Sequence, residues 1–548
     1  MKQFLLIISA SLSTVALFAQ NKKADLIIYN TKIYTVDATF STASAMVIND
    51  GKVVETGGSK NLLAKYDAKE KIDAKSRIVF PGFIDAHSHF LGYGLGLQTA
   101  DLVGTESWDA ILLRMAEFAK KKNIQPRNWI IGRGWDQNDW TEKEFPTKEK
   151  LDRTFPDNPV LLTRVDGHAA IVNQKALDLA RVTNNSKLSG GEVELKDGKL
   201  TGILIDKAVG LVSAKIPSAT LQQLQTALLD AQANCFAVGL TTVEDCGVTY
   251  ATALLMNDLQ KKGELKMRIY AMLSDDPKNF NWAKSNGKIE TPSLHVSSFK
   301  VYADGALGSR GACLLQPYTD KPAWTGFLLS SQQHFDSVAN VIYKMGWQMN
   351  THAIGDSGNR TMLNIYGKYL KGKNDRRWRI EHAQVINHED FYLFEKYSII
   401  PSVQPTHATS DMYWAEKRLG PDRVKGAYAF KQLLKQNGWI PLGTDFPVED
   451  ISPFKTFYAA VFRKDAEGFP AGGFQIENAL TREETIRGMT IWAAKSNFEE
   501  AEKGSLEAGK YADFVILDKD LMTIDEKDVL STSVLSTYIG GKKVYQKK

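Results

Sequence analysis

Residues 81–495 alternate short apolar strands with helical segments, and this order restricts the fold more than any other feature of the chain. A repeated strand-then-helix order is typical of parallel sheets, either a closed barrel or a doubly wound sheet. The length of the region fits an α/β fold, a (β/α)8 TIM barrel that carries a large insertion. The predicted strands are 82–87, 240–245, 295–302, 347–352, 378–382, 398–403 and 439–444, with helices at 221–236, 333–345, 357–370 and 482–495.

Both ends of the chain are rich in short strands and lack this alternation. Asn49-Asp50-Gly51-Lys52 between two apolar runs predicts a tight hairpin turn. Similar strand patterns return at 514–517 and 534–539. We therefore expect one small β-sandwich domain formed from both chain ends. The expected divisions are 20–80 and 496–548 for the sandwich, 81–495 for the barrel, and about 95–217 for the insertion.

Residues 1–19 have the order of residue types found in a secretory signal peptide. Lys2 precedes an apolar stretch from Phe4 to Phe18, and Ala19 supplies a small residue at the end. The stretch is too short to span a membrane comfortably. We expect cleavage after Ala19 and export to the periplasm or the medium, with no stable membrane insertion afterwards.

Charge and cysteine content exclude several classes of protein. The net charge is +5 and no Lys/Arg block stands out, so nucleic-acid binding is not predicted. Cys235, Cys246 and Cys313 form no CxxC pair, so neither a disulfide scaffold nor a zinc ribbon is predicted. The expected partner is a small-molecule substrate, and a homodimer remains open beside a monomer.

The strongest local motif is His87-Ser88-His89, at the end of the first predicted barrel strand. Residues two apart on a strand point to the same side, so both imidazoles can reach one metal ion. The HxH pattern also occurs by chance, and packed or hydrogen-bonded histidines would explain it equally well.

Later strand ends carry further residues of ligand type. His352, His382 and Asp445 each end a predicted strand, and Lys300 lies near the end of another. Each residue alone has an ordinary alternative: a core histidine, a helix N-cap or a surface charge. Together they lie where (β/α)8 enzymes place catalytic groups. Four of the nine histidines in the chain occupy these positions, which is hard to explain by chance.

This pattern resembles the binuclear amidohydrolase superfamily. More narrowly it is similar to the amidohydrolase-3 group, the YtcJ-like branch that includes N-substituted formamide deformylases. The matching phrases are Pro-Gly-Phe-Ile-Asp-Ala-His-Ser-His (81–89), Asp-Gly-His-Ala-Ala (166–170), Lys-Val-Tyr-Ala-Asp-Gly-Ala-Leu-Gly-Ser-Arg (300–310), Thr-His-Ala-Ile-Gly-Asp (351–356), Arg-Ile-Glu-His-Ala-Gln (379–384), Leu-Gly-Thr-Asp-Phe-Pro (442–447) and Gly-Ser-Leu-Glu-Ala-Gly-Lys-Tyr-Ala-Asp-Phe-Val (504–515).

The resemblance implies two divalent metal ions, with zinc best suited to imidazole and carboxylate ligands. His87, His89 and Asp445 would hold one ion, and His352 and His382 the other. Lys300 would bridge them as a CO2-derived carbamate, because an ammonium group has no lone pair. A hydroxide shared by the metals would attack the substrate carbonyl, and Asp445 would act catalytically by moving the proton.

Other residues have two readings each. His168 is a second catalytic candidate that could contact the substrate or an oxyanion, or be a structural loop histidine. Trp135, Asp304 and Arg310 are candidates for substrate binding. Packing explains Trp135 as well, and an ion pair explains Arg310 as well. Asp85 and Glu381 are expected to support neighbouring ligands.

The function predicted first is hydrolysis of a carbon–nitrogen bond other than a peptide bond, in an amide or N-substituted formamide. The first alternative is a lactonase or ester hydrolase with the same site. The second is a metal- or solute-binding protein without turnover. The substrate itself cannot be read from the sequence, because one fold and metal site serve many substrates.

Export predicts a specific mass for the mature protein. Mass spectrometry of protein recovered after secretion should give a chain that begins at Gln20, because cleavage is expected after Ala19. Recovery of the protein in the cytoplasm with Met1 retained would contradict the signal-peptide interpretation.

Overall fold

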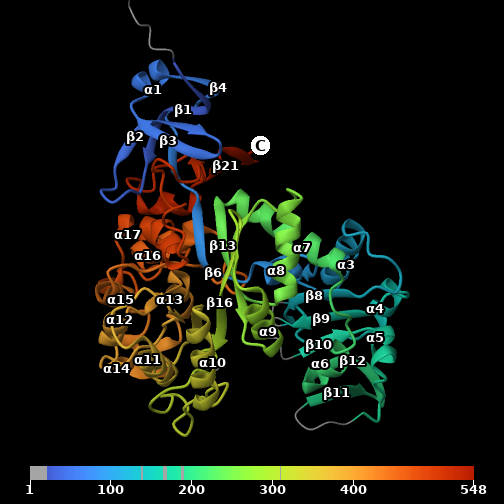
Figure 1. Cartoon of the computed structure of the whole chain (residues 1–548). Helices are drawn as coiled ribbons and strands as arrows, with labels where there is room; N and C mark the ends of the chain where they lie inside the picture. Colours follow the sequence, from blue (N-terminus) through green and yellow to red (C-terminus); the bar gives the residue numbers. More distant parts are fainter. Residues whose placement is uncertain (1–20, 138–139, 165–168, 187–190, 309) are drawn as a thin grey trace, which may run out of the picture.

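The computed structural model describes residues 21–137, 140–164, 169–186, 191–308 and 310–548. The predicted signal peptide at 1–19 and the candidate residue His168 lie outside these residues. The described residues form three sheets: one from both chain ends, one in the insertion and one in the barrel (Figure 1).

The barrel sheet contains seven parallel strands in the order β19-β18-β17-β16-β14-β13-β6. This arrangement confirms the TIM-like barrel in its general form. Strand β14 was not among the predicted strands, although Arg268 to Ser274 is almost entirely buried. The strands are β6 (Phe83–Ser88), β13 (Leu240–Val248), β14 (Arg268–Ser274), β16 (Leu294–Tyr302), β17 (Gln348–Ala353), β18 (Arg379–His382) and β19 (Ile400–Ser402).

Residues 440–445 occupy the gap between β19 and β6, where a strand was predicted. The segment forms no regular ladder, but it bonds to both neighbours. On one side the Gly443 amide donates to the Val403 carbonyl, at 3.1 Å. On the other side the Ala86 amide donates to Leu442 and the Asp445 amide donates to His87, at 3.2 and 2.7 Å. These bonds bring Asp445 next to the histidine strand.

Helices between the strands cover the barrel. In α10 (Gln332–Met345) the buried residues Phe335, Val338, Ala339 and Ile342 recur with helical spacing, so one face packs on the core. Ser331 caps its first turn by accepting from the His334 amide. The other predicted helices correspond to α7 (Leu221–Ala237), α11 (Asp356–Leu370), and the pair α17 (Arg482–Gly488) and α18 (Ile491–Ser496).

Helices α17 and α18 were predicted as one helix over 482–495, and the structure divides it at Met489 and Thr490. The carbonyls of Gly488 and Met489 accept from the amides of Leu442 and Ile84, at 3.0 and 2.8 Å. A continuous helix would use these carbonyls itself. The break therefore supplies acceptors to the barrel at the point where it closes.

Strands from both chain ends share one sheet of eight strands, ordered β22-β21-β20-β5-β1-β2-β3, with β4 beside β1. β20 pairs antiparallel with β5, so Phe514 lies opposite Pro81. The predicted hairpin joins β2 and β3, with Asn49 opposite Lys52. A division into two packed sheets, as in a sandwich, stays a prediction. The strands are β1 (Lys22–Tyr34), β2 (Thr42–Asn49), β3 (Lys52–Gly57), β4 (Tyr66–Asp73), β5 (Ile78–Pro81), β20 (Phe514–Leu517), β21 (Val534–Ile539) and β22 (Lys542–Gln546).

The insertion forms its own sheet of six strands beside the barrel (Figure 1). Trp135 is fully buried in the hydrophobic core of this sheet, where its indole nitrogen donates to the Leu162 carbonyl at 2.8 Å. Its ring stacks on Trp140, with ring centres 6.0 Å apart. The strands are β7 (Ala100–Asp101), β8 (Ile130–Trp135), β9 (Val160–Arg164), β10 (Ala169–Val172), β11 (Gly191–Lys196) and β12 (Lys199–Asp206).

Among the described residues, none of the helices combines the length and the apolar character that crossing a bilayer would require.

Trp135→Ala should destabilise the insertion by about 3–5 kcal/mol, because it leaves a large cavity and removes the hydrogen bond to the Leu162 carbonyl. Limited proteolysis and thermal unfolding would measure the change, with metal content expected to stay constant. The matched control is Leu113→Ala, which alters a side chain of the same insertion that is 63% exposed. A stable Trp135→Ala protein with altered substrate selectivity would instead assign Trp135 to the substrate pocket.

Candidate metal centre

The side chains predicted as metal ligands gather at one rim of the barrel. Parallel strands have their carboxyl ends on the same side, and this side is the catalytic face of (β/α)8 enzymes. The ligand candidates come from successive positions: His87 in β6 with His89 after it, Lys300 in β16, His352 in β17, His382 in β18, and Asp445 in the closing segment.

Asp445 lies close to His87, His89 and His382. Its Oδ1 atom is 3.2 Å from Nε2 of His89 and 3.6 Å from Nε2 of His87. The ring centre of His382 is 4.7 Å from that of His87 and 4.6 Å from that of His352. Ligand atoms of His87, His382 and Asp445 all lie within 4.8 Å of one another. The arrangement is compact enough for metal binding.

Hydrogen bonds at the back of the rings define which nitrogen faces the centre. Nδ1 of His87 bonds Oε2 of Glu381 at 2.6 Å, and Nδ1 of His89 bonds the Cys246 carbonyl at 3.0 Å. Both partners are acceptors, so Nδ1 carries the proton and Nε2 keeps a lone pair. Nδ1 of His382 likewise bonds Oε1 of Gln404 at 2.7 Å. Such outer partners are typical of metal-binding histidines.

The lone pairs of His87 and His89 therefore face an oxygen of Asp445, with no proton between nitrogen and oxygen. Two acceptors at this distance repel unless a cation lies between them. Nε2 of His352 and Oδ1 of Asp445 are also buried without a hydrogen-bond partner among the described residues. These residues therefore fit a divalent cation at the centre.

Burial keeps the imidazoles of His87, His352 and His382 neutral at physiological pH. Desolvation, followed by the charge of Lys300, lowers the pKa of His87 to about 4 and that of His352 to about 3. The pKa of His382 is also well below its usual range, through burial and the neighbouring histidines. Burial alone would raise the pKa of Asp445, but its contact with His89 and the other nearby histidines hold it well below normal. Neutral imidazoles and a carboxylate are competent ligands.

A buried network of charged side chains holds the Nδ1 side of the His87 ring. Oε1 of Glu381 accepts from Nε of Arg379 at 2.7 Å, and Arg379 also pairs with Glu244. None of these three side chains is exposed. Burial would raise the pKa of Glu381, but Arg379 and His87 hold it well below normal. Glu381 therefore stays charged and holds the proton of His87 on Nδ1.

Asp85 joins the histidine strand to the closing segment, as expected for a supporting residue. Its Oδ1 accepts from the amides of His87 and Thr444 at 3.1 and 3.0 Å, and its Oδ2 accepts from the Thr444 hydroxyl at 2.7 Å. At Gly443 a Cβ atom would lie 2.5 Å from the His87 backbone nitrogen. Only glycine allows this close approach.

Lys300 is fully buried beside the centre. Its Nζ atom is 3.1 Å from Nε2 of His87 and 5.1 Å from the centre of the Tyr302 ring. No carboxylate among the described residues forms an ion pair with it. A buried ammonium without an anionic partner is energetically unfavourable.

The candidates for substrate binding lie in less accessible places than expected. Asp304 is buried, and its oxygens accept from the amides of Cys313, Ile354 and Gly355 at 2.8, 2.9 and 2.8 Å. It thereby shapes the turn after β17, with Oδ1 3.8 Å from Nε2 of His352. Arg310 pairs with Asp320 at 2.8 Å, which favours the ion-pair alternative. The burial of Trp135 in the insertion core favours the packing alternative.

His407 is the residue of this centre to which the sequence assigned no role. Its Nε2 atom lies 3.6 Å from Oδ2 of Asp445, and its ring stacks on His382 with centres 5.8 Å apart. The only sequence signal for it was its position just after the predicted strand 398–403.

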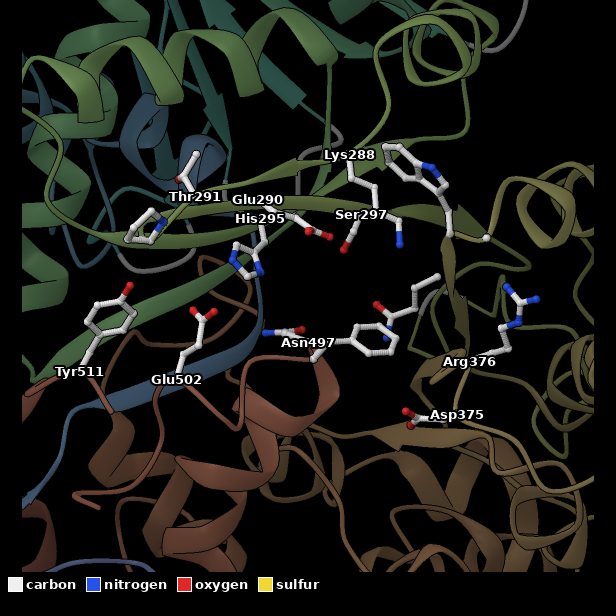
Figure 2. A pocket seen from close by; sticks show the side chains of 15 residues that line it. Lys288, Glu290, Thr291, His295, Ser297, Asp375, Arg376, Asn497, Glu502 and Tyr511 are labelled. Carbon is white, nitrogen blue, oxygen red and sulfur yellow. The ribbon is translucent and has the colours of Figure 1, made fainter. Parts of the chain in front are cut away.

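A cavity of about 630 Å³ lies at the other end of the barrel (Figure 2). His295 and Ser297 near the start of β16 face Asn497, Glu502 and Tyr511 across it. No candidate metal ligand lines this cavity. It lies at the amino ends of the strands, away from the catalytic face, so the chemistry is assigned to the opposite rim.

Comparisons with known proteins agree with this geometry. The model of the amidohydrolase family matches residues 70–545. YtcJ of Bacillus subtilis, named as an amidohydrolase, is 31% identical over 524 residues, covering 94% of this chain and 98% of that protein. The N-substituted formamide deformylase of Arthrobacter pascens is 27% identical, covering 95% and 98% of the two chains. The structure of an uncharacterised metal-dependent hydrolase from Pyrococcus horikoshii aligns with a TM-score of 0.77 at 27% identity, covering 91% and 99%.

Glu381→Gln should weaken metal binding about 10- to 100-fold. In the carboxylate, one oxygen accepts from Arg379 and the other from His87. The glutamine amide replaces one of these oxygens by an NH2 group, which cannot accept. Competition with a chromogenic chelator would measure the affinity, and circular dichroism would check the fold. Glu389→Gln, at a side chain that is 68% exposed, is the control. Equal metal affinity in both variants would show that Glu381 does not orient a ligand.

Proposed function

Because the chain belongs to the amidohydrolase family, as the match over residues 70–545 shows, we propose that it hydrolyses the carbon–nitrogen bond of a small amide or N-substituted formamide. The family and the hydrolase relatives make it a metal-dependent hydrolase that acts on carbon–nitrogen bonds. The similarity to an N-substituted formamide deformylase supports the finer substrate class. A peptide bond is not the proposed target.

One observation carries the proposal: neutral histidines and a carboxylate direct lone pairs at a common centre on the catalytic rim. His87, His89 and Asp445 would hold one divalent ion, and His352 and His382 a second. Imidazole and carboxylate ligands suit zinc. When bound, the ions would supply Lewis acidity that lowers the pKa of water toward about 7 and polarises a carbonyl.

The reaction needs one proton to move from water to the leaving nitrogen. Water adds its oxygen to the carbonyl carbon, the carbon–nitrogen bond breaks, and a carboxylic acid and an amine are released. Asp445 is deprotonated and lies inside the ligand group, so its carboxylate would accept the proton and deliver it to the nitrogen. His87 and His382 hardly compete for that proton, because the pKa of each imidazole is lowered by burial.

We include a carbamate on Lys300 in the proposal. The neutral amine of Lys300 would attack CO2, forming a nitrogen–carbon bond and releasing a proton to water. The product is an anion with two oxygens and one negative charge, which would offset part of the charge of two divalent cations. Full burial next to His87, without an ion pair among the described residues, supports this assignment.

Export of the enzyme to the periplasm or the medium is also a proposal. It rests on the apolar stretch from Phe4 to Phe18 after Lys2.

A substrate panel tests the proposed function on the metal-loaded protein. Suitable probes are 4-nitroformanilide and 4-nitroacetanilide for amides, 4-nitrophenyl acetate for esters, and dihydrocoumarin for lactones. We expect the formanilide to be hydrolysed faster than the other three. A preference for the lactone or the ester would replace the proposal by the alternative activity, and no turnover at all would favour a binding protein.

Lys300→Ala should lose most of the activity and hold fewer than two metal ions per chain, because the bridging ligand is gone. Metal content by mass spectrometry and turnover of the best probe would measure this. Removing bicarbonate during metal reconstitution should slow reactivation of the wild type. The Lys288→Ala control should be slowed to the same extent, since Lys288 lines the distant cavity. Two bound metals and near-normal turnover in Lys300→Ala would refute the bridge.

A further inference from the structure

His407 lies on the same rim as the candidate ligands but belongs to none of the metal sites assigned above. It is in the first turn of α13 (Pro405–Asp411), which begins directly after β19. Pro405, Thr406, Ala408 and Thr409 are buried, so the helix is held firmly against the barrel. Gln404, the residue just before this helix, orients His382 through the bond to its Nδ1 atom. One short segment therefore fixes a metal ligand and presents His407.

The polar end of His407 is buried and unused. Its side chain is 12% exposed, and Nε2 has no hydrogen-bond partner among the described residues. The nearest anionic atom is Oδ2 of Asp445 at 3.6 Å, beyond ordinary hydrogen-bond length. A lone pair directed at a carboxylate would be repelled, so the tautomer with the proton on Nε2 is favoured. Buried donors without partners are rare and often mark functional sites.

The two oxygens of Asp445 separate the centre into two sides. Oδ1 faces His87 and His89, whereas Oδ2 faces His407. The ring of His407 is nearly parallel to that of His382, at 23°. An N–H donor is thereby fixed next to the proposed proton acceptor, on the Oδ2 side of Asp445.

We propose that His407 is a further catalytic residue, whose Nε2–H group donates a hydrogen bond to the carbonyl oxygen of the substrate and to the oxyanion formed from it. This inference rests on the proposed hydrolase function. A fixed donor stabilises the developing charge more than the neutral carbonyl, so it raises kcat rather than ground-state binding. No proton is transferred by His407 in this role.

His407→Leu and His407→Gln test the proposal against a structural role. The glutamine amide can place a donor close to the position of Nε2, and leucine cannot. With 4-nitroformanilide, or the probe that the wild type turns over fastest, kcat of His407→Leu should fall on the order of 100-fold. KM should stay within about twofold, and His407→Gln should recover part of the loss. His388→Leu, at an exposed histidine, is the control and should match the wild type.

A binding measurement makes the test independent of turnover. Inorganic phosphate is a tetrahedral oxyanion, and calorimetric titration of the metal-loaded proteins should show about tenfold weaker binding to His407→Leu. Metal content and melting temperature should equal those of the wild type. If no probe is hydrolysed but phosphate binding falls as expected, the proposed function fails and the donor role of His407 stands. Unchanged kcat and phosphate affinity in His407→Leu, or loss of metal from it, would overturn the inference.

Discussion

The bond between Arg379 and Glu381 is the interaction on which the geometry of the candidate metal centre depends. Arg379 is completely buried in the barrel, and its guanidinium reaches three strands: Glu381 on its own β18, Glu244 on β13 and the Ala86 carbonyl on β6. Burying an ion is costly, and a pair of this kind adds little net stability compared with apolar packing. Removing one partner would nevertheless leave an uncompensated charge, at a cost of about 3–5 kcal/mol. The network thus fixes the alignment of the strands, and with it the orientation of His87.

The metal centre also depends on backbone conformations that side chains rarely adopt. His382 and Asp445 have positive φ angles of 72° and 65°. Such conformations cost about 1–3 kcal/mol each and persist only where the surroundings hold them. Gln404 holds His382 from one side, and the bonds of Asp85 and of the His87 carbonyl hold residues 444 and 445 from the other. Residues 440–445 form no regular ladder, and in this conformation the Asp445 carboxylate points toward the histidines.

The order of strands and helices could be predicted, and so could the gathering of His and Asp side chains at the strand ends, because both leave periodic or positional signals. The pairing of Arg379 with Glu244 could not, because residues far apart in sequence meet only when the barrel closes. β14 was missed for a related reason: it is buried on both faces and lacks the alternation of an exposed strand. Trp135 had been a candidate for the pocket, but sequence alone cannot tell an aromatic residue of a second core from one that contacts substrate. A role for His407 could not be predicted either, because its nearness to Asp445 is visible only in the folded structure.

The pairing of β5 with β20 has a consequence for how the protein is made. Pro81 and Phe514 are neighbours in the sheet, yet the barrel and the insertion are synthesised between them. While the chain is being translated, one edge of β5 therefore has no partner, whereas the barrel strands can already meet their sequence neighbours. Pairing over such a distance along the chain is slow, and an open strand edge invites pairing with other chains. The sheet that begins the described chain is completed only by its last strands, so during synthesis it has to wait for nearly the whole chain.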